Sequence, residues 1–143
     1  MIVVTGAEGE VGQALLKSLG EEGKKAISVF KKGEHEKLKE KTVGSMLFSN
    51  LPLWLSGTYE APWIDKNVEG IVNIGGANSE YSKGLWAWCV EKGKSFVAVD
   101  APVEFEEWAV SQEKKPPSWA ILKPTGTEEV VGNICRILAG GQQ

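Results

Sequence analysis

A glycine-rich turn near the start of the chain limits most strongly how this sequence can fold. Ile2 to Thr5 is a short β-branched run without polar alternation, which is typical of a buried parallel strand. The next segment, Gly6 to Gly12, carries its glycines at the spacing G-x-x-G-x-x-G. Apolar residues then recur at helical spacing, at Val11, Ala14, Leu15 and Leu19. The order of strand, glycine turn and helix predicts the start of a βαβ unit.

Each glycine of this turn has its own expected task. Gly6 permits the tight turn after the strand, Gly9 lets the backbone approach a phosphate, and Gly12 lets the helix pack closely on the sheet. The amino end of the helix would then offer free N–H groups and a positive dipole to an anion. The residues that we expect at a ligand site from this turn are Thr5, Gly6, Gly9, Val11 and Gly12.

Charged residues near the turn bear on this expectation in two ways. Glu8 and Glu10 would repel a phosphate, so a tight turn that binds nothing stays open as an alternative. The second predicted strand, Ala26 to Phe30, is followed by Lys31 and Lys32, where NAD-binding proteins often carry an acidic residue for the ribose hydroxyls. Lysines there would suit NADP or another phosphorylated nucleotide as the cofactor, and they are equally common as solvated surface residues.

A second glycine-rich turn follows the predicted strand Gly70 to Ile74. Gly75 and Gly76 come directly after it, and then Asn78 and Ser79, either of which can cap the next helix. The carboxyl ends of the first and fourth strands of a doubly wound sheet often flank the crevice where ligands bind. We therefore expect the two glycine turns to line one phosphate-binding cleft. A glycine pair selected only for tight packing is the equal alternative.

Strand and helix patterns alternate along the rest of the chain. Further strands are predicted over 43–48, 95–99 and 119–122, and helices over 35–41, 79–92, 103–112 and 127–138. Residues 49–67 read as an irregular loop with one helical turn. The alternation predicts a single domain over 1–143, with an α/β, Rossmann-like three-layer sandwich and a mainly parallel sheet of five to six strands.

Few side chains of this sequence are arranged for catalysis. Asp100 follows the strand 95–99, where site residues gather in this fold class, and capping of the following helix is its alternative use. His35, the single histidine, lies among charged residues and is typical of a surface position. Cys89 and Cys135 lie in apolar helical patterns, which favours buried free thiols over a disulfide.

Composition limits the partners and the location of the protein. With 16 basic and 19 acidic residues, the net charge of -3 offers no positive field, so we expect no nucleic-acid partner. No apolar stretch approaches the roughly 18 residues that span a bilayer, and no leader peptide is recognisable, so we expect a cytoplasmic protein without a membrane partner. Trp86 and Trp88 cannot share one helix face, which favours a subunit contact through this helix and a homo-oligomer.

The opening segment, Thr5 to Gly12, resembles the short-chain dehydrogenase/reductase and NAD-dependent epimerase superfamily, whose fingerprint is T-G-x-x-G-x-x-G. Catalysis in that superfamily usually needs Tyr-x-x-x-Lys. Four residues after Tyr59 and Tyr81 this chain has Trp63 and Leu85. The resemblance therefore implies nucleotide binding without dehydrogenase chemistry by that route.

A second resemblance covers Val72 to Val99, which is similar to the lonely-guy and molybdenum-cofactor-carrier group of nucleotide-binding proteins. That group has P-G-G-x-G-T-x-x-E, a short helix and then G-K-P. Here Ile74 replaces the proline, Asn78 the third glycine and Ser79 the threonine. The group's catalytic arginine has no counterpart, because the single arginine, Arg136, lies in the last predicted helix. The resemblance implies a shared fold and ligand class without the hydrolase activity.

These observations favour a carrier-like protein that binds a small-molecule nucleotide or dinucleotide. One alternative is an enzyme that acts on a nucleotide or nucleotide-sugar, either phosphoribohydrolase-like or NADP-dependent. Another is an oligomeric structural protein without a ligand.

Overall fold

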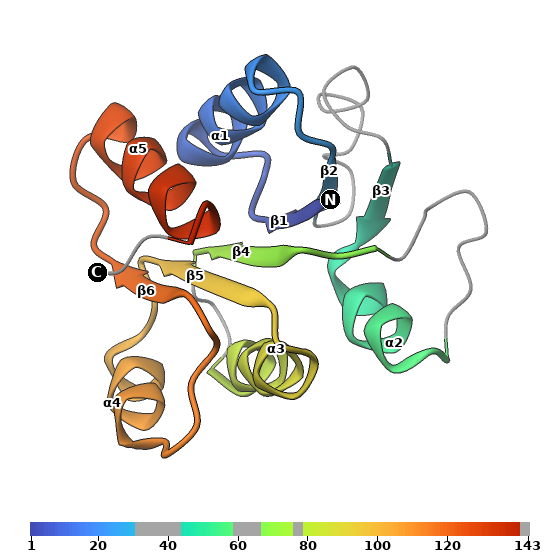
Figure 1. Ribbon diagram of the computed structural model, residues 1–143, viewed down its shortest axis with the longest axis vertical. Coiled ribbons are helices and arrows are strands. Elements are labelled where there is room, and N and C mark those ends of the chain that lie inside the picture. The colour runs from blue at the N-terminus through green and yellow to red at the C-terminus, as the bar shows by residue number, and fades with distance from the viewer. Residues whose placement is uncertain (31–43, 59–66, 76–78, 141–143) are drawn as a thin grey trace.

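One parallel sheet lies between two layers of helices in a computed structural model of the chain (Figure 1). The structure describes residues 1–30, 44–58, 67–75 and 79–140. Its strands are β1 (Ile2–Thr5), β2 (Ala26–Phe30), β3 (Gly44–Leu47), β4 (Gly70–Ile74), β5 (Ser95–Val99) and β6 (Trp119–Leu122).

The strand order across the sheet is β3-β2-β1-β4-β5-β6, and every neighbouring pair is parallel. This order reverses between β1 and β4, as it does in the Rossmann fold. The predicted α/β, Rossmann-like sandwich with a parallel sheet is therefore confirmed.

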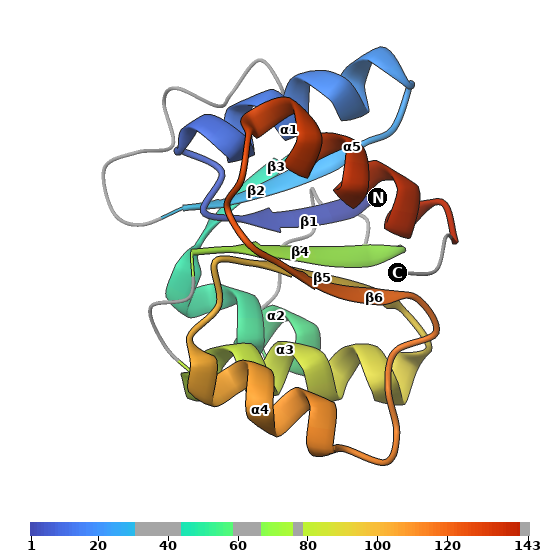
Figure 2. The same cartoon turned by 90° about the vertical axis from the view of Figure 1, so that its left-hand side faces the viewer.

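Helices cover both faces of the sheet (Figures 1 and 2). One layer consists of α1 (Glu10–Glu21) and α5 (Thr127–Leu138). The other consists of α2 (Leu51–Ser56), α3 (Ser79–Lys92) and α4 (Val103–Ser111), with a short 3-10 turn, η2 (Phe48–Asn50), before α2. Because α1, α3, α4 and α5 each follow a strand, their amino ends all lie at the carboxyl edge of the sheet.

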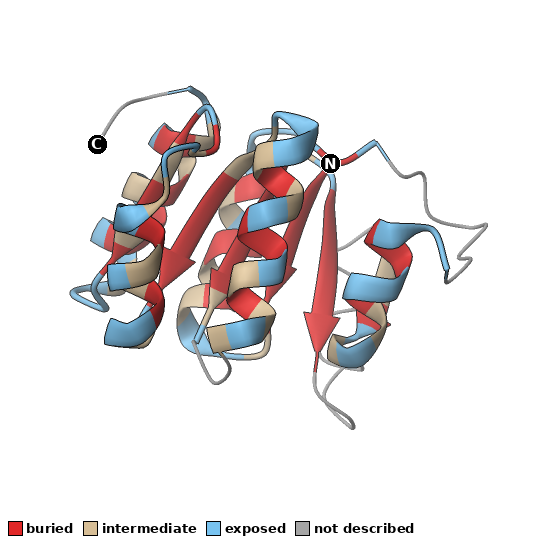
Figure 3. Ribbon diagram, turned by 90° about the horizontal axis from the view of Figure 1, so that it is seen from below, coloured by how far each residue is buried: buried red, intermediate tan, exposed pale blue. Residues whose placement is uncertain are grey.

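The sheet divides the apolar core into two parts, and its four central strands, β1, β2, β4 and β5, are buried on both faces (Figure 3). Val3 and Ile71 face the layer of α2, α3 and α4, whereas Val4 and Val72 face α1 and α5. The first part is aromatic and centres on Trp86, whose ring makes edge contacts with its neighbours. Burial of both faces explains why the strand sequences are continuous apolar runs.

The helical turn expected within residues 49–67 is α2, which occupies six of them and is longer than one turn. Residues 59–66 of the expected loop lie outside the described residues. Pro52 signals a loop in the sequence, but it lies in the first turn of α2, where a missing N–H costs nothing. Gly57 ends the helix in the left-handed conformation, with a φ of 88°. Burial of Trp54 and Leu55 holds this short helix on the sheet.

Three smaller predictions have different outcomes. The helix expected over 35–41 lies outside the described residues. Cys89 and Cys135 are free thiols as expected, but only Cys89 is buried, while Cys135 is half-buried. Within the described part of the chain, no helix has both the length and the apolar content of a membrane span.

Candidate functional site

The turn after β1 packs directly against the end of β4. Gly6 has a φ of 66°, and a Cβ at this position would overlap the carbonyl oxygen of Ile74. A Cβ at Gly12, inside α1, would lie 2.6 Å from the carbonyl oxygen of Gly6 and 2.8 Å from the carbonyl carbon of Ala7. Both positions are closer than van der Waals contact permits. Backbone packing therefore requires glycine at Gly6 and Gly12, whether or not a ligand binds.

Gly9 differs from the other two glycines. It is the N-cap residue of α1, with a φ of -81° and a ψ of 176°, and any residue can adopt this conformation. A Cβ there would make only an ordinary contact, 3.7 Å from the carbonyl oxygen of Gly6. The fold thus tolerates Ser, Asp or Asn, which would cap the helix. Glycine instead leaves the exposed amino end of α1 without a side-chain cap.

The second glycine turn lies beside the first. Thr5 of β1 is in register with Asn73 of β4. Gly75 follows with a φ of 76°, and its N–H donates to the Val99 carbonyl at 2.9 Å. Ser79 begins α3, and its hydroxyl oxygen is buried without a hydrogen-bond partner among the described residues. The two turns therefore flank the point where the strand order reverses, which is where ligands bind in open α/β sheets.

The other predicted site residues are not all located at the crevice within the described part of the chain. Lys31, Gly76 and Asn78 lie outside the described residues. Val11 is half-buried in the first turn of α1. Asp100 follows β5 at the same edge of the sheet and is exposed.

Asp100 is the one non-glycine residue with a positive φ, 58°, in the described part of the chain. Its N–H donates to the carbonyl of Leu122 at 3.0 Å, which ties it to the end of β6. The N-cap of α4 is Pro102, and no side chain caps it there. The alternative expectation, that Asp100 caps this helix, therefore has no support in the hydrogen bonds of α4.

A buried polar chain beneath the crevice was not anticipated from the sequence. The hydroxyl of Thr5 donates to Oδ1 of Asn73 at 2.5 Å, and Nδ2 of Asn73 donates to the hydroxyl of Ser82 at 2.8 Å. All three residues are buried. The Thr5 hydroxyl is therefore bonded within the fold, where it joins β1 through Asn73 to α3. The one available signal was a polar residue at position 73, inside an otherwise apolar strand.

Three further side chains that could take part in acid–base, nucleophilic or anion-binding chemistry, those of Tyr81, Cys89 and Arg136, are engaged, buried or remote from the crevice. The Tyr81 hydroxyl donates to the Phe48 carbonyl at 2.7 Å, and burial raises the pKa of this phenol well above its ordinary value. Burial also raises the pKa of the Cys89 thiol. Arg136 lies in the last turn of α5, at the end of that helix away from the crevice. The described residues contain no group of three or more His, Cys, Asp or Glu that could hold a metal ion.

Glu8, the acidic residue within the first turn, is half-buried. The amide of Gln13 donates to its backbone carbonyl at 2.9 Å, which anchors the turn to α1. One carboxylate oxygen of Glu8 is buried and has no hydrogen-bond partner in the described structure. Two polar atoms of the two turns, Glu8 Oε2 and Ser79 Oγ, therefore have no hydrogen-bond partner among the residues that the structure describes.

Solved structures share this architecture. An NAD-dependent NDP-hexosamine 5,6-dehydratase of tunicamycin biosynthesis, TunA, superposes with a TM-score of 0.57 at 14% identity, over 85% of this chain and 53% of its own. The fold is the Rossmann fold. A short-chain dehydrogenase/reductase superfamily protein from Agrobacterium tumefaciens with bound NAD superposes with a TM-score of 0.50 at 17% identity, over 86% of this chain and 48% of its own.

The chain thus spans about half the length of these two proteins. No protein-family model matches it, and no curated protein is similar to it in sequence. The comparisons support the Rossmann-like expectation, whereas the resemblance to the lonely-guy group stays a prediction.

Proposed function

We propose that this chain binds a nucleotide or dinucleotide in the crevice between the turns that follow β1 and β4. The observation that carries this proposal is Gly9. Packing explains Gly6 and Gly12, but neither the backbone nor a steric contact requires glycine at position 9. A phosphate that approaches the open amino end of α1 would require it, because a side chain there would occupy the space of the anion.

The polar groups around the crevice fit a nucleotide better than a bare phosphate. The hydroxyl of Ser79 and one carboxylate oxygen of Glu8 have no hydrogen-bond partner among the described residues. The hydroxyl would donate to a phosphate oxygen, and the carboxylate oxygen would accept from a ribose hydroxyl. A dinucleotide is favoured because, of the solved structures described above, one is an NAD-dependent dehydratase and another contains bound NAD. The preference for NADP over NAD depends on Lys31, which lies outside the residues that the structure describes.

The bound nucleotide would be carried without hydride transfer of the tyrosine–lysine type. That chemistry needs a tyrosine whose pKa is lowered, whereas burial raises the pKa of Tyr81. The hydroxyl of Tyr81 is also bonded to a backbone carbonyl. We therefore favour a carrier-like binding protein.

Asp100 favours a second candidate, an enzyme that acts on the nucleotide. Its left-handed backbone holds an exposed carboxylate at the carboxyl edge, and such strained positions are frequent at active sites. Turnover of a nucleotide that disappears in Asp100→Asn, while nucleotide binding persists, would support this candidate over the carrier.

The decisive experiment is a thermal-shift and calorimetric titration with NAD, NADP, ATP and AMP. A ligand at one hundred times its dissociation constant should stabilise the protein by about 2.7 kcal/mol. Gly9→Asp should fold normally and lose this stabilisation. Gly20→Asp is the matched control, because it adds the same charge at the other end of α1, where a Cβ meets no atom within 4 Å.

Binding to the wild type and Gly20→Asp, but not to Gly9→Asp, is the expected result. If no nucleotide stabilises the wild type at millimolar concentration, nucleotide binding is wrong. Equal binding by Gly9→Asp would place the ligand away from the amino end of α1.

A further inference from the structure

A cleft between α2 and α3 lies apart from the crevice of the glycine turns. α3 begins at the carboxyl edge of the sheet, beside the crevice, and ends at the amino edge, where β5 begins. A groove of about 520 Å³ runs between α2 and α3, and a cavity of about 480 Å³ lies where both helices end. The two spaces share Leu55, Ser56, Trp88 and Lys92, so they form one cleft, which we call the α2–α3 cleft.

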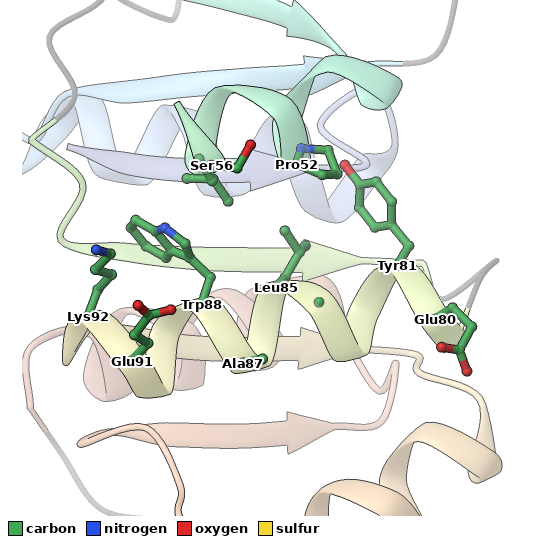
Figure 4. Close-up of a pocket in the computed structure, with 11 residues that line it drawn as sticks. Pro52, Ser56, Glu80, Tyr81, Leu85, Ala87, Trp88, Glu91 and Lys92 are labelled. Carbon is green, nitrogen blue, oxygen red and sulfur yellow. The ribbon is translucent and has the colours of Figure 1, made fainter. Parts of the chain in front are cut away.

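Most of the length of the α2–α3 cleft is apolar. Leu55 of α2 and Leu85 of α3 are buried and line it, and the ring of Trp88 stands between the two helices (Figure 4). Tyr81 borders the end nearer the crevice, and its hydroxyl is already bonded to the Phe48 carbonyl. From Tyr81 to the end of α3 the cleft extends for about 16 Å. This shape suits an extended apolar chain.

Positive charge is concentrated at the other end of the cleft, at the amino edge. Lys92 and Lys94 line the cavity there, and none of its described lining residues is acidic. Within the described part of the chain, neither lysine forms an ion pair. The carboxylate of Glu69, which Lys94 influences electrostatically, is bonded to the amino group of Met1 at 2.9 Å. Two unpaired lysines at one cavity favour an anionic group between them.

The other polar groups at this end lack an acceptor or are engaged. The indole nitrogen of Trp88 is buried and has no hydrogen-bond partner among the described residues. The hydroxyl of Ser56 donates to the Leu53 carbonyl at 3.0 Å. A ligand that brings acceptor atoms therefore fits this end better than one that brings donors.

The balance of charges favours a ligand with a single negative charge. Glu91 borders the groove close to Lys92, so these two residues and Lys94 together carry a net charge of about +1. Glu80 lies at the opposite end of α3, where it pairs with Lys83 at 3.3 Å (Figure 4). A carboxylate carries one negative charge, whereas a phosphate monoester carries about two.

We propose that the α2–α3 cleft binds a small amphiphilic carboxylate, with its carboxylate at Lys92 and Lys94 and its apolar chain against the ring of Trp88. Burial of the chain would supply most of the affinity, and the lysines would fix its direction in the cleft. This site is separate from the nucleotide crevice, because the two lie at opposite edges of the sheet.

Calorimetric titration with decanoate, below the concentration at which it forms micelles, tests the proposal. Decanol lacks the charge and propionate lacks the chain, so each should bind about tenfold more weakly or less. Lys92→Met combined with Lys94→Met should raise the dissociation constant of decanoate about tenfold and leave that of decanol unchanged. Lys17→Met combined with Lys114→Met is the matched control, because it removes the same charge at two exposed lysines that do not line the cleft.

The control variant should bind decanoate as the wild type does, and all variants should keep the circular-dichroism spectrum of the wild type. The proposal is wrong if decanoate does not bind to the wild type at millimolar concentration. Equal affinity for decanol and decanoate, or equal binding of decanoate by the Lys92 and Lys94 variant, would also overturn it, because the lysines would then contribute nothing.

Discussion

The glycine motif contains Gly6, Gly9 and Gly12, and a different physical constraint applies to each of them. The carbonyl of Ile74 excludes a side chain at Gly6, and the backbone of the preceding turn excludes one at Gly12. At Gly9, by contrast, a side chain would make only an ordinary van der Waals contact. The spacing alone could not distinguish a packing glycine from a binding glycine, because that depends on which atoms lie within a few ångströms.

Gly12→Ala should therefore destabilise the protein by about 2–4 kcal/mol, because the new methyl group would overlap backbone that cannot move independently. Gly132→Ala should instead stabilise it by about 0.5–1 kcal/mol, since the site is an open helix interior. Urea unfolding of both variants measures the two free energies. Equal stability of Gly12→Ala and the wild type would contradict the close packing of α1 on the turn.

The left-handed backbone of Asp100 leads to a second prediction. Asp100→Asn and Asp100→Gly should unfold within about 0.5 kcal/mol of the wild type, because both residues tolerate a positive φ. Asp100→Val should cost about 1–2 kcal/mol, since a β-branched side chain is strained there. Thermal denaturation of the three variants is the measurement, and a valine variant as stable as the asparagine variant would argue against this backbone conformation.

At the scale of elements, the chain Thr5–Asn73–Ser82 connects β1, β4 and α3 beneath the two turns. Asn73→Leu should destabilise the protein by about 2–4 kcal/mol, because it leaves two buried hydroxyls without partners. Adding Thr5→Val and Ser82→Ala removes those hydroxyls and should recover part of the loss. Chemical denaturation of the single and triple variants checks this expectation. Additive losses in the triple variant would mean that the three side chains do not act as one network.

Helices and strands could be predicted from the sequence where the spacing of their apolar residues was regular. The bounds of α3, β5 and α5 agree with the expected ranges, because buried strands are short apolar runs and these helices have clear breakers at their ends. The sequence predicts only a single helical turn where α2 lies, because Pro52 within the helix and Gly57 directly after it resemble loop signals. Burial of Trp54 and Leu55 against the sheet stabilises α2. This tertiary contribution cannot be estimated from the helix propensity of the local sequence.

At the scale of the whole molecule, both helix layers depend on one sheet, so we expect the described parts of the chain to unfold together. The two free cysteines report on different layers: Cys89 lies in α3 and packs into the core part on that side of the sheet, whereas Cys135 lies in α5 and packs against the part beneath α1 and α5. Thiol labelling in increasing urea should show both becoming reactive at one midpoint, which should coincide with the loss of helical circular dichroism. Two separated midpoints would mean that the layers unfold independently and would contradict a single domain.

The sequence by itself determined the fold class, because alternating apolar runs of strand and helix length can bury their faces only in a layered α/β sheet. It also located the first glycine turn and the strand ends that carry candidate residues. Only the tertiary structure decided that β1 and β4 are neighbours, that the Thr5 hydroxyl bonds to Asn73, and that Gly9 alone of its motif has room for a side chain. These features depend on contacts between residues that are distant in the chain and close in space. A local sequence pattern does not contain information about such contacts.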